Sequence, residues 1–345
     1  MLVGGLALAG AAPPPEVLSR PQSPDARAPA SETAFLLTER DLIPEGIALD
    51  PRTWTLYLGS FRKAKILAVS LDGRPSTFVP EGADGLQAVL GLRVDQARDR
   101  LWACTSTAPQ LAPGRAAPPP GVTGLMAWDL GTGKSVFRWL RPKTETLDAF
   151  NDLTIAGDGT VYVSGFAAGT IYRLKPDATE PETWMTLDKQ DAPNGIDLSE
   201  DGKRLYVSTG KRLVVIDVAS GRVQELAVPK RAFTSGIDGL AVRGPTLIAI
   251  QRNKGVMQGW RIARFRLAAD GLSATAVETL AENDRRWSQP TTGVVVGRWF
   301  YYIGNSQFPA FGRGNDLPPV DELKDVRILR LALADRLRPP PPPAP

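Results

Sequence analysis

Four side chains with oxygen donors occupy the same position in a motif that recurs along the chain. The motif is a polar residue, most often followed by glycine, and then an aliphatic run. The copies that begin with a carboxylate or carboxamide side chain start at Glu45, Asn151, Asn194 and Asp238. Carboxylates and carboxamides are hard ligands of the kind that Ca²⁺ and Mg²⁺ prefer, and two converging carboxylates repel unless a cation neutralises them. We therefore interpret these four residues as ligands of one divalent metal ion.

The alternative interpretation is that these residues only form turns, because Asn-Gly and Asp-Gly are common turn dipeptides. Four oxygen ligands at one phase of the repeat favour the metal site. Asp152 follows Asn151 at a position where the other copies have glycine. It either orients a metal ligand from behind or serves local geometry, and the sequence leaves both open. Thr292, at the start of the sixth copy, is placed with Asp152 as a supporting residue.

The composition narrows the chemistry further. The 345-residue chain contains no histidine and one cysteine, Cys104. This excludes Ser-His-Asp triads, Cys-His dyads and His-ligated zinc or iron sites. The expected cofactor is Ca²⁺, with Mg²⁺, Mn²⁺ and Zn²⁺ as alternatives. The formal charge of +4 arises from basic residues scattered among acidic ones, so we expect no nucleic acid partner.

The repeat also predicts the elements that position these residues. Its copies begin at Glu45, Leu90, Asn151, Asn194, Asp238 and Thr292. Each is followed by two more strand-like segments and, in most units, a weaker fourth. Four antiparallel strands about every 44 residues indicate an all-β, six-bladed β-propeller, whereas an open sandwich does not require six similar units. The first strand of each blade lines the channel, so the motif residues form a ring at one mouth.

The last unit lacks a fourth strand. The segment at 33–38 precedes the first unit and has the composition of a strand. We expect this N-terminal strand to pair with the last blade and close the ring, which leaves no exposed sheet edge.

The two ends of the chain differ from the repeats. Residues 2–12 are small and apolar, too short to span a bilayer as a helix, and Ala9-Gly10-Ala11 resembles a signal-peptidase site. We expect a signal peptide at 1–12, either complete or truncated, with a disordered N-terminus as the alternative. A disordered linker at 13–31, the propeller at 33–334 and a Pro-rich disordered tail at 335–345 would follow. This organisation predicts a periplasmic or secreted protein without stable membrane insertion.

Two long insertions at 107–122 and 307–325 connect second to third strands. In a propeller these connections lie on the face where the first strands begin, so both insertions should overhang the metal. Loops on a rigid scaffold commonly carry specificity. We expect the walls of a substrate pocket to include Asn253, Trp260, Gln307, Phe308 and Phe311. For any one of them, an ordinary surface loop is the alternative.

Four segments together resemble the senescence-marker-protein/gluconolactonase (regucalcin-like) family of six-bladed propellers. They are PEGIALD at 44–50, FNDLTIAGDGTVYVS at 150–164, PNGIDLSEDGKRLYVS at 193–208 and GIDGLAV at 236–242. The resemblance implies metal ligands at Glu45, Asn194 and Asp238, with Asn151 binding directly or through water. It also implies Asp238 as general base or nucleophile. More distant paraoxonase-type relatives use histidines near the metal, which this chain lacks.

These observations predict a Ca²⁺-dependent hydrolase that acts on a lactone or small ester, similar to gluconolactonase. Its partner would be a small-molecule substrate, and a propeller that closes its own core is expected to be a monomer. The alternative is a non-catalytic propeller of the cell envelope that binds a ligand or partner and keeps a structural Ca²⁺. An open coordination position facing a pocket would favour catalysis.

Overall fold

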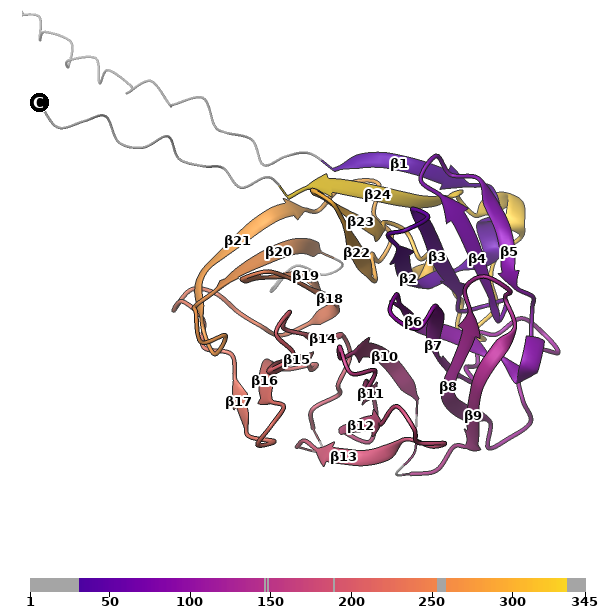
Figure 1. The fold of residues 1–345 in the computed structure, drawn as a ribbon. Coiled ribbons are helices and arrows are strands. Elements are labelled where there is room, and N and C mark those ends of the chain that lie inside the picture. Colours follow the sequence, from indigo (N-terminus) through magenta and orange to yellow (C-terminus); the bar gives the residue numbers. More distant parts are fainter. Residues whose placement is uncertain (1–30, 146, 148, 189, 253–258, 334–345) are drawn as a thin grey trace, which may run out of the picture.

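The computed structural model describes residues 31–145, 147, 149–188, 190–252 and 259–333. Its strands form six four-stranded antiparallel sheets arranged around a central axis (Figure 1). The first strand of each blade, which contains or closely follows the repeated motif residue, lies innermost (Figure 1). The predicted six-bladed β-propeller is therefore confirmed.

The first three blades follow one another along the chain. Blade one contains β2 (Pro44–Asp50), β3 (Thr55–Ser60), β4 (Lys65–Ser70) and β5 (Pro75–Val79). Blade two contains β6 (Ala88–Asp95), β7 (Arg100–Ser106), β8 (Val122–Asp129) and β9 (Ser135–Pro142). Blade three contains β10 (Phe150–Ile155), β11 (Val161–Gly165), β12 (Thr170–Leu174) and β13 (Glu182–Thr186).

The next two blades repeat this order, and the sixth is composite. Blade four contains β14 (Ile196–Leu198), β15 (Arg204–Ser208), β16 (Leu213–Asp217) and β17 (Val223–Glu225). Blade five contains β18 (Ile237–Arg243), β19 (Thr246–Arg252), β20 (Trp260–Leu267) and β21 (Ala274–Glu282). Blade six contains β22 (Gly293–Val296), β23 (Trp299–Ile303), β24 (Val326–Ala332) and β1 (Glu32–Leu37). Short 3-10 helices occur at η1 (Arg40–Leu42), η2 (Ala83–Gly85), η3 (Phe308–Ala310) and η4 (Val320–Glu322).

The N-terminal strand closes the ring as predicted. β1 pairs antiparallel with β24, the third strand of blade six, from Glu32 opposite Arg330 to Leu37 opposite Val326. Figure 1 shows these two strands side by side at the outside of the ring. Closure covers the edge that β24 would otherwise expose.

Apolar side chains of neighbouring blades interlock to form the core. Between blades two and three, the rings of Trp139 and Phe150 stack with centroids 5.5 Å apart, and Phe150 also contacts Tyr172. Such clusters recur between successive blades and hold the inner strands at fixed positions around the axis. The scaffold is therefore rigid where the motif residues emerge.

Several expectations concern residues outside the described part of the chain. They are the signal peptide at 1–12, almost all of the linker at 13–31, the tail at 335–345 and the pocket residue Asn253. Among the described residues, no helix combines the length and apolar character that crossing a membrane requires.

Candidate functional site

The four predicted ligands lie together. Glu45, Asn151, Asn194 and Asp238 all line one cavity of about 650 Å³. Leu90, the motif residue of blade two, lines it as well. We call Glu45, Asn151, Asn194 and Asp238 the ring layer. The sixth motif residue, Thr292, does not line this cavity, and its neighbour Thr291 does.

β-bulges place most of these side chains. The register between first and second strands slips within the motif of four blades: at Pro44–Ile47, Val89–Leu92, Phe150–Leu153 and Ile237–Leu240. A bulge adds a residue outside the ladder pairing and re-aims its side chain. The motif residue of each of these blades is therefore released from the pairing and turned to the channel mouth.

Glycine follows the motif residue because neighbouring first strands approach closely. A Cβ added to Gly46 would lie 2.0 Å from the carbonyl oxygen of Leu90 in the next blade. One added to Gly195 would lie 2.4 Å from the carbonyl oxygen of Asp238. Glycine at this phase therefore permits the packing that brings the ring layer together.

Asp152 occupies the glycine phase in blade three and uses its carboxylate to join two blades. It accepts hydrogen bonds from the backbone N–H groups of Leu153 (2.8 Å) and Ile196 (3.2 Å). Burial raises the pKa of Asp152 to about 6, although the positive charge of Arg93 and these two hydrogen bonds lower it. Its side chain makes no hydrogen bond to a ring-layer side chain among the residues described.

Thr292 supports Glu45 through the backbone. Its hydroxyl donates a 2.5 Å hydrogen bond to the carbonyl oxygen of Glu45, and the Thr291 hydroxyl donates to the same oxygen at 3.1 Å. These two bonds tie blade six to blade one at the point where Glu45 leaves the ladder.

The Glu45 carboxylate is buried, and one of its two oxygens lacks a hydrogen-bond partner in the part of the chain that the structure describes. The residue is 7% exposed, and its Oε2 atom has no hydrogen-bond partner among the described residues. Burial raises the pKa of Glu45 well above its usual range, and the negative charges of Asp238 and Asp152 raise it further. An unpartnered buried carboxylate oxygen is unfavourable unless a ligand satisfies it.

Asp238 has a similarly perturbed environment. Burial raises its pKa to about 7, and the charge of Asp152 adds to this effect. The Asn194 side-chain amide donates a 3.1 Å hydrogen bond to Asp238 Oδ1, which opposes the rise and fixes the carboxylate. The two ring-layer carboxylates therefore favour protonation unless a cation is present.

A second set of charged groups lies deeper among the first strands and was not predicted. Arg93 donates hydrogen bonds to the carbonyl oxygens of Leu153 and Ile196, both at 3.2 Å, and its Nη2 lies 3.6 Å from Asp197 Oδ1. We call Arg93, Asp152 and Asp197 the inner layer. In the sequence, Arg93 and Asp197 resemble ordinary polar strand residues, and only the closed ring brings them together.

Aromatic side chains form part of the cavity wall. Trp260, Phe308 and Phe311 line it, as do Phe61 and Phe166. Phe61 and Phe308 contact edge to face with centroids 4.9 Å apart.

The two long loops meet beside the cavity. Gln110 of the first loop donates a 3.0 Å hydrogen bond to Asn315 of the second. Gln307 does not line the cavity, because its amide is committed to the backbone of Arg40 and Lys324 at 2.9–3.0 Å.

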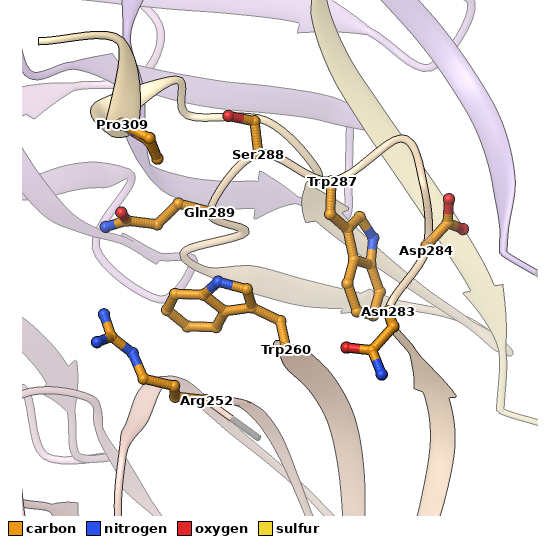
Figure 2. A pocket seen from close by; sticks show the side chains of 8 residues that line it. All are labelled: Arg252, Trp260, Asn283, Asp284, Trp287, Ser288, Gln289 and Pro309. Atoms are coloured by element: carbon orange, nitrogen blue, oxygen red, sulfur yellow. The ribbon is translucent and has the colours of Figure 1, made fainter. Parts of the chain in front are cut away.

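Two polar wall residues, Arg252 and Gln289, were not predicted. They line the main cavity and also an adjoining pocket of about 320 Å³ (Figure 2). Their only sequence signal is an Arg at the end of a second strand and a Gln shortly before the sixth motif copy.

The ring layer fits a divalent cation. It combines two carboxylates of raised pKa, one unsatisfied oxygen and two carboxamides in one open cavity. Among the described residues, no three His, Cys, Asp or Glu side chains group in a metal-binding arrangement. Carboxamide oxygens would therefore complete the donor set, as Ca²⁺ accepts.

The family comparison supports the earlier resemblance. The model of the SMP-30/gluconolactonase/LRE-like region matches residues 43–265, which span the first five motif copies. A search of the curated proteins finds no sequence that matches.

Solved structures share the fold at low identity. A gluconolactonase from Xanthomonas campestris has a TM-score of 0.57 at 18% identity, covering 90% of this chain and 98% of that one. Regucalcin from Agrobacterium tumefaciens has a TM-score of 0.56 at 16% identity, covering 88% and 93%. Virginiamycin B lyase from Staphylococcus aureus has a TM-score of 0.51 at 15% identity, covering 87% and 98%. Such distant similarity shows the fold alone, since one fold hosts several chemistries. The match of residues 43–265, together with the six closed blades, shows that the chain belongs to the SMP-30/gluconolactonase/LRE-like family.

Proposed function

We propose that this protein is a divalent-metal-dependent hydrolase that opens a lactone or cleaves a small ester, with Ca²⁺ as the expected ion. The observation that carries the proposal is the ring layer, where Glu45 Oε2 lacks a partner beside a second carboxylate and two carboxamides. Family membership supports it, as does the gluconolactonase among the proteins of similar fold.

In this proposal, the four ring-layer side chains hold the ion. A divalent cation held there would neutralise the two carboxylates and would supply Lewis-acid polarisation of the acyl oxygen of a substrate. Ca²⁺ takes six to eight oxygen ligands, so four protein ligands would leave further positions for water or substrate. Open positions facing a pocket are typical of catalytic sites and distinguish them from closed structural ones.

Asp238 is the proposed general base. Its carboxylate lines the cavity among the other ring-layer residues, and a positioned carboxylate can accept a proton from water. Asp238 accepts a proton from a water molecule whose oxygen forms a bond to the acyl carbon. The acyl C–O bond then breaks, the leaving oxygen receives the proton, and the product is an open-chain hydroxy acid. Asn194 keeps the Asp238 carboxylate in place through its 3.1 Å hydrogen bond.

The proposed substrate is a small molecule and the proposed active form a monomer. A cavity of about 650 Å³ is within the range of small-ligand sites. The blades close on themselves through β1, so the core needs no partner chain.

The test combines thermal unfolding with hydrolysis. We would measure the melting temperature in EDTA and after adding Ca²⁺, and then assay lactone opening in the same samples. A Ca²⁺-dependent rise in melting temperature together with Ca²⁺-dependent turnover supports the proposal. A rise without turnover favours the non-catalytic binding propeller. No rise means that the ring layer is not a significant metal site.

A further inference from the structure

A second pocket adjoins the main cavity and is lined by an arginine, Arg252. It is about 320 Å³ in volume and shares Arg252, Trp260 and Gln289 with the main cavity, so the two spaces adjoin. We call it the side pocket. The shared residues mean that a substrate held at the ring layer can extend a substituent into it.

Arg252 gives the side pocket a positive charge. Among the described residues, no side chain or backbone group receives a hydrogen bond or ion pair from its guanidinium. The guanidinium carbon lies 5.3 Å from the centroid of the Trp260 ring, and the positive charge of Arg252 lowers the pKa of Asp238, against the larger effect of burial, without forming an ion pair with it. A stacked guanidinium is held in one orientation while its N–H donors stay available.

The backbone around this pair is well fixed. Arg252 and Trp260 face each other across the β19–β20 ladder. The Arg252 N–H donates to the carbonyl oxygen of Gly236 at 2.8 Å, and the carbonyl oxygen of Trp260 accepts from Asn283 at 2.9 Å. These backbone bonds and the packing of the guanidinium on Trp260 together restrict Arg252, which lowers the entropy lost on binding a ligand.

Gln289 supplies a second donor at the same place. In Figure 2 its amide and the Arg252 guanidinium extend toward the same end of the Trp260 ring. Gln289 has a left-handed φ of 54°, which is uncommon for a residue other than glycine, Asn or Asp. Its carbonyl oxygen is held by the Ser306 hydroxyl at 2.8 Å. Strained positions of this kind concentrate at ligand sites.

The acidic group of the side pocket is already neutralised. Asp284 lines the pocket, but it accepts a 2.9 Å hydrogen bond from Arg286 Nε and pairs with the same guanidinium. Among the described residues that line the pocket, Arg252 therefore supplies the charge available to a ligand.

We propose that the side pocket binds a carboxylate carried by the substrate, and hence that the preferred substrates are anionic lactones. Arg252 pairs with the two carboxylate oxygens, Gln289 donates a further hydrogen bond, and Trp260 keeps the guanidinium in place. The planar fork of arginine matches a carboxylate. The reaction assigned here rests on the proposed function, whereas the binding of the carboxylate can be measured without turnover.

The kinetic test compares two lactones that differ in one group. D-Glucono-1,4-lactone ends in a CH₂OH group, and D-glucaro-1,4-lactone has a carboxylate there. In Ca²⁺ we expect kcat/KM to favour the carboxylate-bearing lactone by about tenfold or more, because hydrogen bonds to charged groups contribute about 1.5–3 kcal/mol. Arg252→Gln should remove most of this preference, with a much smaller change on the neutral lactone.

The control is Arg298→Gln. Arg298 also stacks on a tryptophan, Trp299, with a carbon-to-centroid distance of 5.3 Å, but neither residue lines the cavity or the side pocket. This variant should keep the preference. Equal activity of the native protein on the two lactones, or equal losses on both in Arg252→Gln, would overturn the inference.

A binding experiment separates this inference from the proposed function. Calorimetric titration of the Ca²⁺-loaded protein would compare D-glucarate with D-gluconate, which are the two hydrolysis products. Tighter binding of glucarate that disappears in Arg252→Gln supports the side pocket even if neither lactone is hydrolysed, in which case the proposed function alone falls. Absence of any preference for glucarate overturns the inference even if both lactones are hydrolysed.

Discussion

The carboxylates of the ring layer lie close to those of the inner layer, but the two layers differ in how the negative charge is balanced. In the inner layer, Asp152 and Asp197 share the positive charge of Arg93, and their oxygens accept backbone hydrogen bonds. In the ring layer, Glu45 and Asp238 form no ion pair with any Lys or Arg that the structure describes.

The difference separates structure from function. The inner layer is complete within the chain, so its charges hold blades two, three and four together. The ring layer is incomplete, because its carboxylates repel each other and Glu45 keeps an unsatisfied oxygen. Groups that remain unsatisfied on a rigid scaffold indicate a site for an external ligand. The predictions below test this contrast.

The largest expected effect is on turnover. Asp238→Asn keeps the shape of the side chain and removes the proposed base, so we expect lactone hydrolysis to fall about 10²–10⁴-fold. Because the variant also removes carboxylate repulsion, its melting temperature in EDTA should equal or exceed that of the native protein. Asp270→Asn, which alters an exposed turn, is the control. Native turnover in Asp238→Asn would refute the assigned role.

The next effect concerns the inner layer. Arg93→Gln leaves Asp152 and Asp197 without a compensating charge, and breaking a buried ion pair typically costs about 3–5 kcal/mol. We expect a loss of this size in chemical denaturation, with or without Ca²⁺.

The control for this variant is Arg74→Gln. Arg74 pairs with Asp72 at 2.8 Å, and both side chains are exposed, so its replacement should cost less than about 1 kcal/mol. Similar losses in the two variants would contradict the structural role of the inner layer.

A third prediction uses pH. In the metal-free protein, the pKa of Asp238 rises from 3.8 to about 7, so the folded state binds a proton that the unfolded state has released. The contribution of Asp238 to stability in EDTA is therefore full below about pH 4 and is lost as pH rises toward 7. Ca²⁺ requires the carboxylate, so its stabilising effect should grow over the same interval. A Ca²⁺-induced shift in melting temperature that is constant from pH 5 to 8 would show that Asp238 does not bind the ion.

The smallest effect is expected at Thr292. Thr292→Val removes one of the two hydroxyl donors to the Glu45 carbonyl oxygen, while Thr291 remains. We expect a loss of about 0.5–1.5 kcal/mol in unfolding free energy and a weaker affinity for Ca²⁺. Thr246→Val, which removes an exposed hydrogen bond to Arg243, should leave Ca²⁺ affinity unchanged. If both variants kept the native affinity for Ca²⁺, Thr292 would have no supporting role at the metal site.

The fold and the members of the ring layer were predictable because both follow from periodicity. The repeated motif shows which residues occupy equivalent positions in the six blades. In a closed propeller, residues at equivalent positions of the inner strands lie close together around the channel. The pairing of β1 with β24 followed from the missing fourth strand of blade six.

Other features depend on contacts that no local pattern contains. Arg93 pairs with Asp197 across two blades, and nothing in the sequence around either residue records the other. The side chain of Gln307 was expected in the cavity wall, but its carbonyl and amide groups bind the backbone instead. Gln289 and Arg252 emerge as neighbours only once blades five and six are in place. The period of the repeat predicts which residues occupy equivalent positions in the blades. The direction in which a side chain points at a bulge or in a loop depends on tertiary contacts, which the repeat does not contain.

The β-bulges at the motif have an evolutionary consequence. A residue at a bulge contributes no pairing to the ladder, so its replacement leaves the strand register unchanged. The chain illustrates this, because Leu90 occupies in blade two the phase that Asn151 occupies in blade three, and both blades keep four strands. Mutations can therefore replace the side chains at the channel mouth one blade at a time with little effect on folding. Such a scaffold gives a lineage access to new chemistry without a search for a new fold.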